Sequence, residues 1–121
     1  MAERNDSPGV RGEERRESPR VPMQFQVRQA EGEAVFENRE GDLSLGGCAW
    51  RGGTMDAGTH VELRFRLPSL PDELRVRGEV LHVRTGPQGP ATHVRFMDLP
   101  VETELAIARH LDDVQLAASK S

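Results

Sequence analysis

Apolar and polar residues alternate in short segments through the middle of the chain. The clearest segment is 61–67, where Val, Leu, Phe and Leu alternate with Glu, Arg and Arg. The same alternation occurs at 21–28, 74–80 and 92–96, and short apolar runs stand at 34–36 and 48–50. A period of two sends successive side chains to opposite faces of a β-strand, so these segments predict six strands, most with one buried face.

Turn residues rather than helices separate the predicted strands. Glycine and proline gather at 41–47, 52–53, 68–72 and 86–90. Six short strands joined in this way predict a mainly β fold, either a sandwich or a barrel. We expect a six-stranded antiparallel β-barrel, because closing a barrel removes exposed sheet edges.

The C-terminal segment has the features of one α-helix, predicted from Pro100 to Leu116. Proline suits the first turn of a helix, and Glu102 and Glu104 favour its positive end. One helical face is predicted to consist of Val101, Leu105, Ala108 and Leu111. Residues 117–121 are expected to fray.

The N-terminal segment differs from the rest of the chain in composition. Residues 1–20 carry five acidic and five basic residues, and Met1 and Val10 are their only large apolar residues. Such a segment buries too little surface to offset its ordering entropy. We therefore expect a disordered tail at 1–14, a folded domain at 15–116, and a mobile arm at the start of that domain.

Length, charge and cysteine content exclude several classes of protein. The chain has 121 residues, which suits one small domain. Its net charge of −4 disfavours nucleic-acid binding, which needs a basic face. No apolar run approaches the ~20 residues of a membrane-spanning helix. The single cysteine, Cys48, excludes an internal disulfide and is expected to be a small buried hydrophobe in a cytoplasmic protein.

The sequence lacks the usual catalytic motifs. Neither a Gly-x-Ser-x-Gly elbow nor a phosphate-binding loop ending in Gly-Lys-Ser/Thr is present. Four histidines are scattered, and only His82 and His93 are expected to approach each other, on neighbouring strands. Two histidines without a clear third ligand make a weak metal site. We therefore expect no enzyme, no metal and no cofactor.

An arginine-rich segment stands directly before the first predicted strand. It reads Arg-Arg-Glu-Ser-Pro-Arg over residues 15–20, so Arg16 and Arg20 are four positions apart. Guanidinium groups bind phosphate in a bidentate manner and stack on flat rings. Because 15 of the 16 basic residues are arginine, the segment alone is more typical of a solvated tail than of a binding site.

A second motif, Asp42-x-Ser44-x-x-Gly47, lies in the predicted connection before the third strand. Aspartate and serine at such positions often cap a turn through nearby backbone N–H groups. Alternatively, a fixed carboxylate accepts hydrogen bonds from the N1–H and N2–H₂ groups of guanine, and glycine leaves room for a ligand or a backbone. The motif alone leaves both interpretations open.

In this order and spacing the two motifs resemble the PilZ domain family, as does the string Val94–Leu99. The resemblance covers about residues 15–116 and implies a receptor for the bacterial second messenger cyclic di-GMP. By resemblance, arginines clamp phosphates and guanine Hoogsteen edges, and the second motif contacts a guanine from the barrel side. The ligand residues so implied are Arg15, Arg16, Arg20, Asp42, Ser44 and Gly47. His93 departs from the small residue expected before Val94.

The functional hypothesis is a non-enzymatic cyclic di-GMP receptor that signals to a partner protein through ordering of its N-terminal arm. A third guanidinium, on Arg15, would offset the charge of a second stacked ligand, so two ligands per chain are expected. The alternative is a nucleotide-independent interaction adaptor in motility or pilus machinery. The downstream process is left open among motility, exopolysaccharide secretion and transcription.

Overall fold

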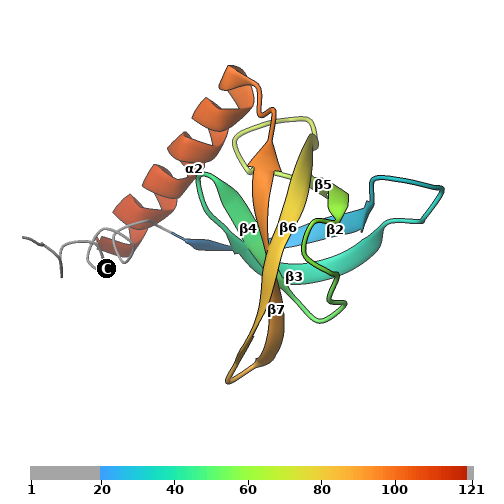
Figure 1. The fold of residues 1–121 in the computed structure, drawn as a ribbon. Coiled ribbons are helices and arrows are strands. Elements are labelled where there is room, and N and C mark those ends of the chain that lie inside the picture. Colours follow the sequence, from blue (N-terminus) through green and yellow to red (C-terminus); the bar gives the residue numbers. More distant parts are fainter. Residues whose placement is uncertain (1–19, 120–121) are drawn as a thin grey trace, which may run out of the picture.

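The computed structural model describes residues 20–119 and contains six strands and one helix (Figure 1). The elements are β2 (Val21–Gln29), β3 (Glu37–Leu43), β4 (Gly47–Arg51), β5 (His60–Phe65), β6 (Leu74–Gly86), β7 (Gly89–Met97) and α2 (Val101–Ser119). The strands form a closed barrel in the order β2-β3-β4-β7-β6-β5, and every pairing is antiparallel. The predicted six-stranded antiparallel barrel with a C-terminal helix is therefore confirmed, whereas the disordered tail and the mobile arm expected at the N-terminus lie outside the described residues.

The barrel interior is filled by the residues that share one parity in the alternating segments. In β5, Val61, Leu63 and Phe65 are buried, whereas Glu62 and Arg64 lie on the outer face. The ring of Phe65 contacts Phe25 edge-on at 5.5 Å and stacks with Phe96 at 6.4 Å between centroids. The sequence periodicity thus identified the core faces of these strands.

The position predicted for the second strand is wrong. Residues 34–36 precede β3, which is built from the polar segment Glu37–Leu43. Phe36 instead lies outside the barrel, below the guanidinium carbons of Arg28 and Arg64 at 4.3 and 3.8 Å from its ring centroid. The segment 37–43 forms a strand because it pairs with β2 along seven residues. As a result Asp42 lies within a strand, and the predicted connection at 41–47 shrinks to residues 44–46.

The buried face of α2 is also shifted from the predicted one. Ile107 and Leu111 are fully buried with the barrel core, and Val114 packs against it. Val101 and Leu105 remain 66% and 64% exposed. The helix carries apolar residues on two faces, and the barrel covers only one. The helix also continues to Ser119, three residues past the predicted end. Among residues 20–119, no helix is long and apolar enough to cross a membrane.

The hairpin of β6 and β7 extends beyond the other strands as a two-stranded ribbon (Figure 1). Its turn is formed by residues 87 and 88. The pairing register shifts between Val80 and His82, which leaves Leu81 as a β-bulge. This ribbon and the neighbouring strands β4 and β3 carry the candidate site.

Candidate functional site

Four residues form a row across neighbouring strands on the outer face of the barrel. Asp42 on β3 pairs with Ala49 on β4, Ala49 pairs with His93 on β7, and His93 pairs with His82 on β6. Their sequence neighbours Leu43, Cys48, Trp50 and Val94 are buried in the core. Because side chains alternate along a strand, the row must face outward.

The bulge at Leu81 places His82 in this row. Val76, Gly78 and Val80 face inward, so continued alternation would also turn His82 toward the interior. The extra residue reverses the parity, and His82 pairs with the outward-facing His93. The two imidazole rings stack at 4.8 Å with an interplanar angle of 18°. The expectation that these histidines approach on neighbouring strands is confirmed.

The environment of the histidine pair disfavours a charged His93. Partial burial lowers the pKa of His93, and the nearby His82, Arg20 and Arg84 lower it further. Cationic neighbours disfavour a second positive charge. Within the described part of the chain, no group of three or more His, Cys, Asp or Glu residues is arranged to hold a metal ion.

A hollow of about 230 Å³ lies over this row. Its lining includes four of the residues implicated by the sequence, Arg20, Asp42, Ser44 and Gly47, together with Ala49, His82 and His93. They meet because Arg20 directly precedes β2, and Pro22 of β2 pairs with Asp42. Arg15 and Arg16 lie outside the described residues.

Arg20 and Asp42 are the oppositely charged groups in this hollow whose polar atoms have no partner within residues 20–119. Neither the Arg20 guanidinium nor the Asp42 carboxylate forms a hydrogen bond or ion pair with any residue in 20–119. The half-buried Asp42 is therefore no turn cap within this part of the chain. Both charged groups can take up a ligand without losing a partner there.

Ser44 and Gly47 have structural roles in the turn between β3 and β4. The Ser44 hydroxyl and the Ser44 backbone N–H both donate to the Gly47 carbonyl oxygen, at 3.0 and 2.9 Å. A Cβ added to Gly47 would lie 2.1 Å from the Val94 carbonyl oxygen. The Ser44 side chain thus stabilises the turn, but through a carbonyl oxygen rather than through the backbone N–H groups expected, and the space left by Gly47 accommodates the β7 backbone. Contacts of either residue with a ligand stay a prediction.

Sequence reasoning missed Ala49 and gave no site role to the histidine pair. The signal for Ala49 is its pairing with Asp42, and a turn predicted at 41–47 hides that pairing. No sequence signal marks the bulge that brings His82 outward. Cys48 is buried, as expected, and burial raises the pKa of its thiol.

Comparison with known families and structures gives one consistent result. The family described as PilZ domain matches residues 14–113. No curated protein sequence matches the chain. Several solved structures have the same fold, and at sequence identities of 15 to 20% the similarity shows the fold alone.

Three of these structures illustrate the similarity. MotI/DgrA, the inhibitor of motility of Bacillus subtilis, shares 16% identity with a TM-score of 0.66 over 84% of this chain and 51% of its own. YcgR of Escherichia coli, solved in complex with cyclic di-GMP, shares 15% identity with a TM-score of 0.65 over 88% of this chain and 48% of its own. The PilZ domain of CeSA from a cellulose-synthesizing bacterium shares 20% identity with a TM-score of 0.56 over 81% and 99%. The chain thus spans about half the length of the first two.

Proposed function

The chain belongs to the PilZ domain family, and from this membership we propose that it is a non-enzymatic, cytoplasmic receptor for cyclic di-GMP. YcgR, with the same fold, has been solved with this ligand bound. The observation that carries the proposal is the hollow in which Arg20 and Asp42 face a common space without partners among residues 20–119.

Arg20 and Asp42, which have no partner among residues 20–119, match complementary parts of a guanine nucleotide. The Arg20 guanidinium suits a phosphate, which it can bind with two parallel hydrogen bonds. The Asp42 carboxylate suits the N1–H and N2–H₂ donors of guanine. In this proposal Arg15 and Arg16 join Arg20 from the N-terminal side, and Ser44 and Gly47 border the base.

Signal output passes through the segment before β2. Arg20 lines the hollow and directly precedes the first strand, so a ligand held by Arg16 and Arg20 fixes the segment between them. Ordering of this arm creates a surface that a partner protein reads. Arg15 supplies charge for a second stacked ligand. Motility and exopolysaccharide secretion are the candidate processes.

Calorimetric titration of the full chain with cyclic di-GMP tests the proposal, with GTP and cyclic AMP as control ligands. Arg20→Ala should weaken binding about ten- to a hundredfold, since a charge-assisted hydrogen bond contributes roughly 1.5–3 kcal/mol. Arg77→Ala, an exposed arginine on β6 that does not line the hollow, should bind like the parent. Absence of binding by the parent chain would refute the receptor function.

Asp42→Asn separates the two interpretations of the carboxylate. Asparagine keeps one acceptor oxygen and the shape of the side chain, but it loses the charge and the second acceptor. A guanine contact predicts weaker binding by Asp42→Asn with unchanged stability. Binding equal to that of the parent would remove Asp42 from the ligand site.

The alternative function, a nucleotide-independent interaction adaptor, draws on a different observation. Val101 and Leu105 lie one turn apart on α2 and are largely exposed, which favours a protein contact there. An adaptor of this kind would bind its partner with equal affinity in the presence and absence of cyclic di-GMP, and Leu105→Glu would weaken that complex.

A further inference from the structure

A second row of residues lies beside the first on the same outer face. Arg51 on β4 pairs with Ala91 on β7, and Ala91 pairs with Arg84 on β6. Each member stands two positions along its strand from a member of the first row, and residues two apart in a strand share a face. The register therefore places one arginine on each side of Ala91, and this row lies next to Ala49 and His93.

A hollow of about 400 Å³ lies over this second row. It shares Arg20, Asp42, Ala49 and His93 with the first hollow and adds the residues Arg51, Arg84, Gly86, Pro87, Gln88 and Ala91. The small side chains of Ala49 and Ala91 lie between longer ones on the neighbouring strands. The two hollows are thus adjacent compartments of one depression.

The second hollow is basic although the chain as a whole is acidic. Three guanidinium groups line it, and Asp42 is the one carboxylate among its lining residues. The chain carries a net charge of −4. Concentrating cations in a concave surface creates a local positive potential that attracts anions.

The arginines that distinguish this hollow have weak internal partners or none. Arg84 forms no hydrogen bond or ion pair with any residue in 20–119. Arg51 approaches a Glu40 carboxylate oxygen at 3.8 Å, and that side chain is 69% exposed. By contrast, Arg28 and Arg95 hold their glutamates at 2.6 Å. An exposed ion pair at 3.8 Å contributes little and is easily exchanged for another anion.

We propose that Arg51 and Arg84, together with His93, form a second anion-binding subsite that takes a phosphate group above Ala91. The two arginines stand two strands apart, so their backbones are separated by roughly 10 Å. Both side chains are long enough to reach a common oxyanion from opposite sides, and each presents a bidentate face. The position of His93 between the two hollows lets its imidazole face the same anion.

This inference extends the proposed function. The phosphate belongs either to the cyclic dinucleotide that fills the first hollow or to a separate anion. Both sources present the same chemistry to Arg51 and Arg84, and competition distinguishes them.

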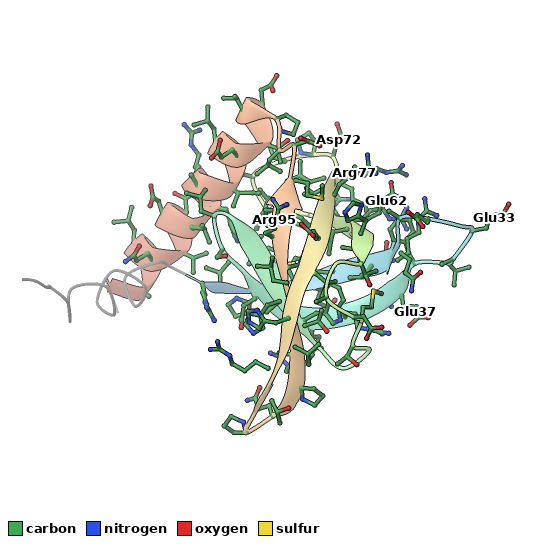
Figure 2. The ribbon with its side chains drawn as sticks, in the orientation of Figure 1. Glu33, Glu37, Glu62, Asp72, Arg77 and Arg95 are labelled. Atoms are coloured by element: carbon green, nitrogen blue, oxygen red, sulfur yellow. The ribbon has the colours of Figure 1, made fainter. Side chains whose placement is uncertain are left out.

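Titration of the full chain with cyclic di-GMP, with variants of the second row, is the first test. Arg84→Gln and Arg51→Gln should each weaken binding about tenfold, which corresponds to the loss of one charge-assisted contact. Arg77→Gln is the matched control, because it makes the same change on β6 at the end opposite the hairpin tip (Figure 2). Ala91→Ile should also weaken binding, because it fills the floor without changing the charge. Parent-like affinity of both arginine variants would exclude the dinucleotide as the source of the phosphate.

Inorganic pyrophosphate tests the subsite independently of the nucleotide. Its addition to the full chain should shift the NMR signals of the Arg51 and Arg84 Nε–H groups and the His93 ring, and Arg84→Gln should abolish the shifts. Weakened cyclic di-GMP binding in saturating pyrophosphate would assign the phosphate to the dinucleotide, and unchanged binding would assign it to a separate anion. If the parent fails to bind the dinucleotide but pyrophosphate shifts these signals, the receptor function fails and the subsite stands. If pyrophosphate causes no shifts, two results would overturn the subsite. One is that both arginine variants bind the dinucleotide like the parent, and the other is that the parent does not bind the dinucleotide.

Discussion

Gly47 combines a place in the candidate site with a demand of the fold. A Cβ at this position would lie 2.1 Å from the Val94 carbonyl oxygen, which belongs to the paired strand β7. Gly47→Ala should therefore lower the free energy of unfolding by about 1–3 kcal/mol, as overpacking does elsewhere. Gly46→Ala is the control, because a Cβ there meets no atom within 4 Å. Urea denaturation measures both, and equal stability of the two variants would contradict the close approach.

His93 gives the protein a pH dependence whose sign can be worked out. Burial lowers the pKa of His93 in the folded state, and His82, Arg20 and Arg84 lower it further. Asp42 is the acidic residue that lines both hollows together with His93. In the unfolded chain a histidine has a pKa of about 6.5. The unfolded state therefore binds the proton first as the pH falls, and stability decreases below about pH 6.5 until the lower folded pKa is passed.

His93→Gln should remove this contribution. The loss of melting temperature between pH 7.5 and pH 5.5 should be smaller in His93→Gln than in the parent. His60→Gln, at an exposed histidine at the start of β5, should behave like the parent. The same pH sensitivity in all three proteins would assign the effect to other groups.

Among the strands, β5 and β2 could be predicted from the sequence and β3 could not. Alternation reveals a strand when large apolar residues fill its inner face, as Val61, Leu63 and Phe65 do. In β3 only Gly41 and Leu43 are buried, and Gly41 is small because a Cβ would lie 1.8 Å from the Ala49 carbonyl oxygen. The apolar signal of this strand is therefore nearly absent, and its place is set by pairing with β2 and β4.

Strand β7 contains a buried hydroxyl without a hydrogen-bond partner among residues 20–119. Thr92 is fully buried, and its hydroxyl has no hydrogen-bond partner in the described part of the chain. Thr92→Val keeps the shape and removes the unsatisfied group, so it should raise the free energy of unfolding by about 1 kcal/mol. Thr92→Ser keeps the hydroxyl and loses a methyl group, and it should destabilise. A lower stability of Thr92→Val in urea would show that the hydroxyl has a partner, such as a buried water.

On the scale of the whole molecule, the sequence predicts that the two motifs belong to one site, but it does not predict the shape of that site. Arg20 and Asp42 are distant in sequence, and they meet because the residue pairs Pro22–Asp42 and Asp42–Ala49 join three strands. The second row depends on two further registers, between β4 and β7 and between β6 and β7. On β6 it follows the bulge at Leu81, which no residue type predicts. The motifs predict which residues the candidate site contains, whereas the strand registers decide which other residues lie beside them.

The proposed receptor function predicts that a ligand bound on the barrel protects the chain before β2 from trypsin. Arg15 and Arg16 are cleavage sites just ahead of Arg20, which lines both hollows. A ligand held by Arg16 and Arg20 fixes the backbone between them, and a fixed backbone does not readily enter a protease active site. Saturating cyclic di-GMP should therefore slow cleavage after Arg15 and Arg16, while cleavage after Arg4 serves as the internal control. Arg20→Ala should show no protection. Equal cleavage rates with and without ligand, in a sample shown by calorimetry to bind, would mean that the signal leaves the barrel by another route.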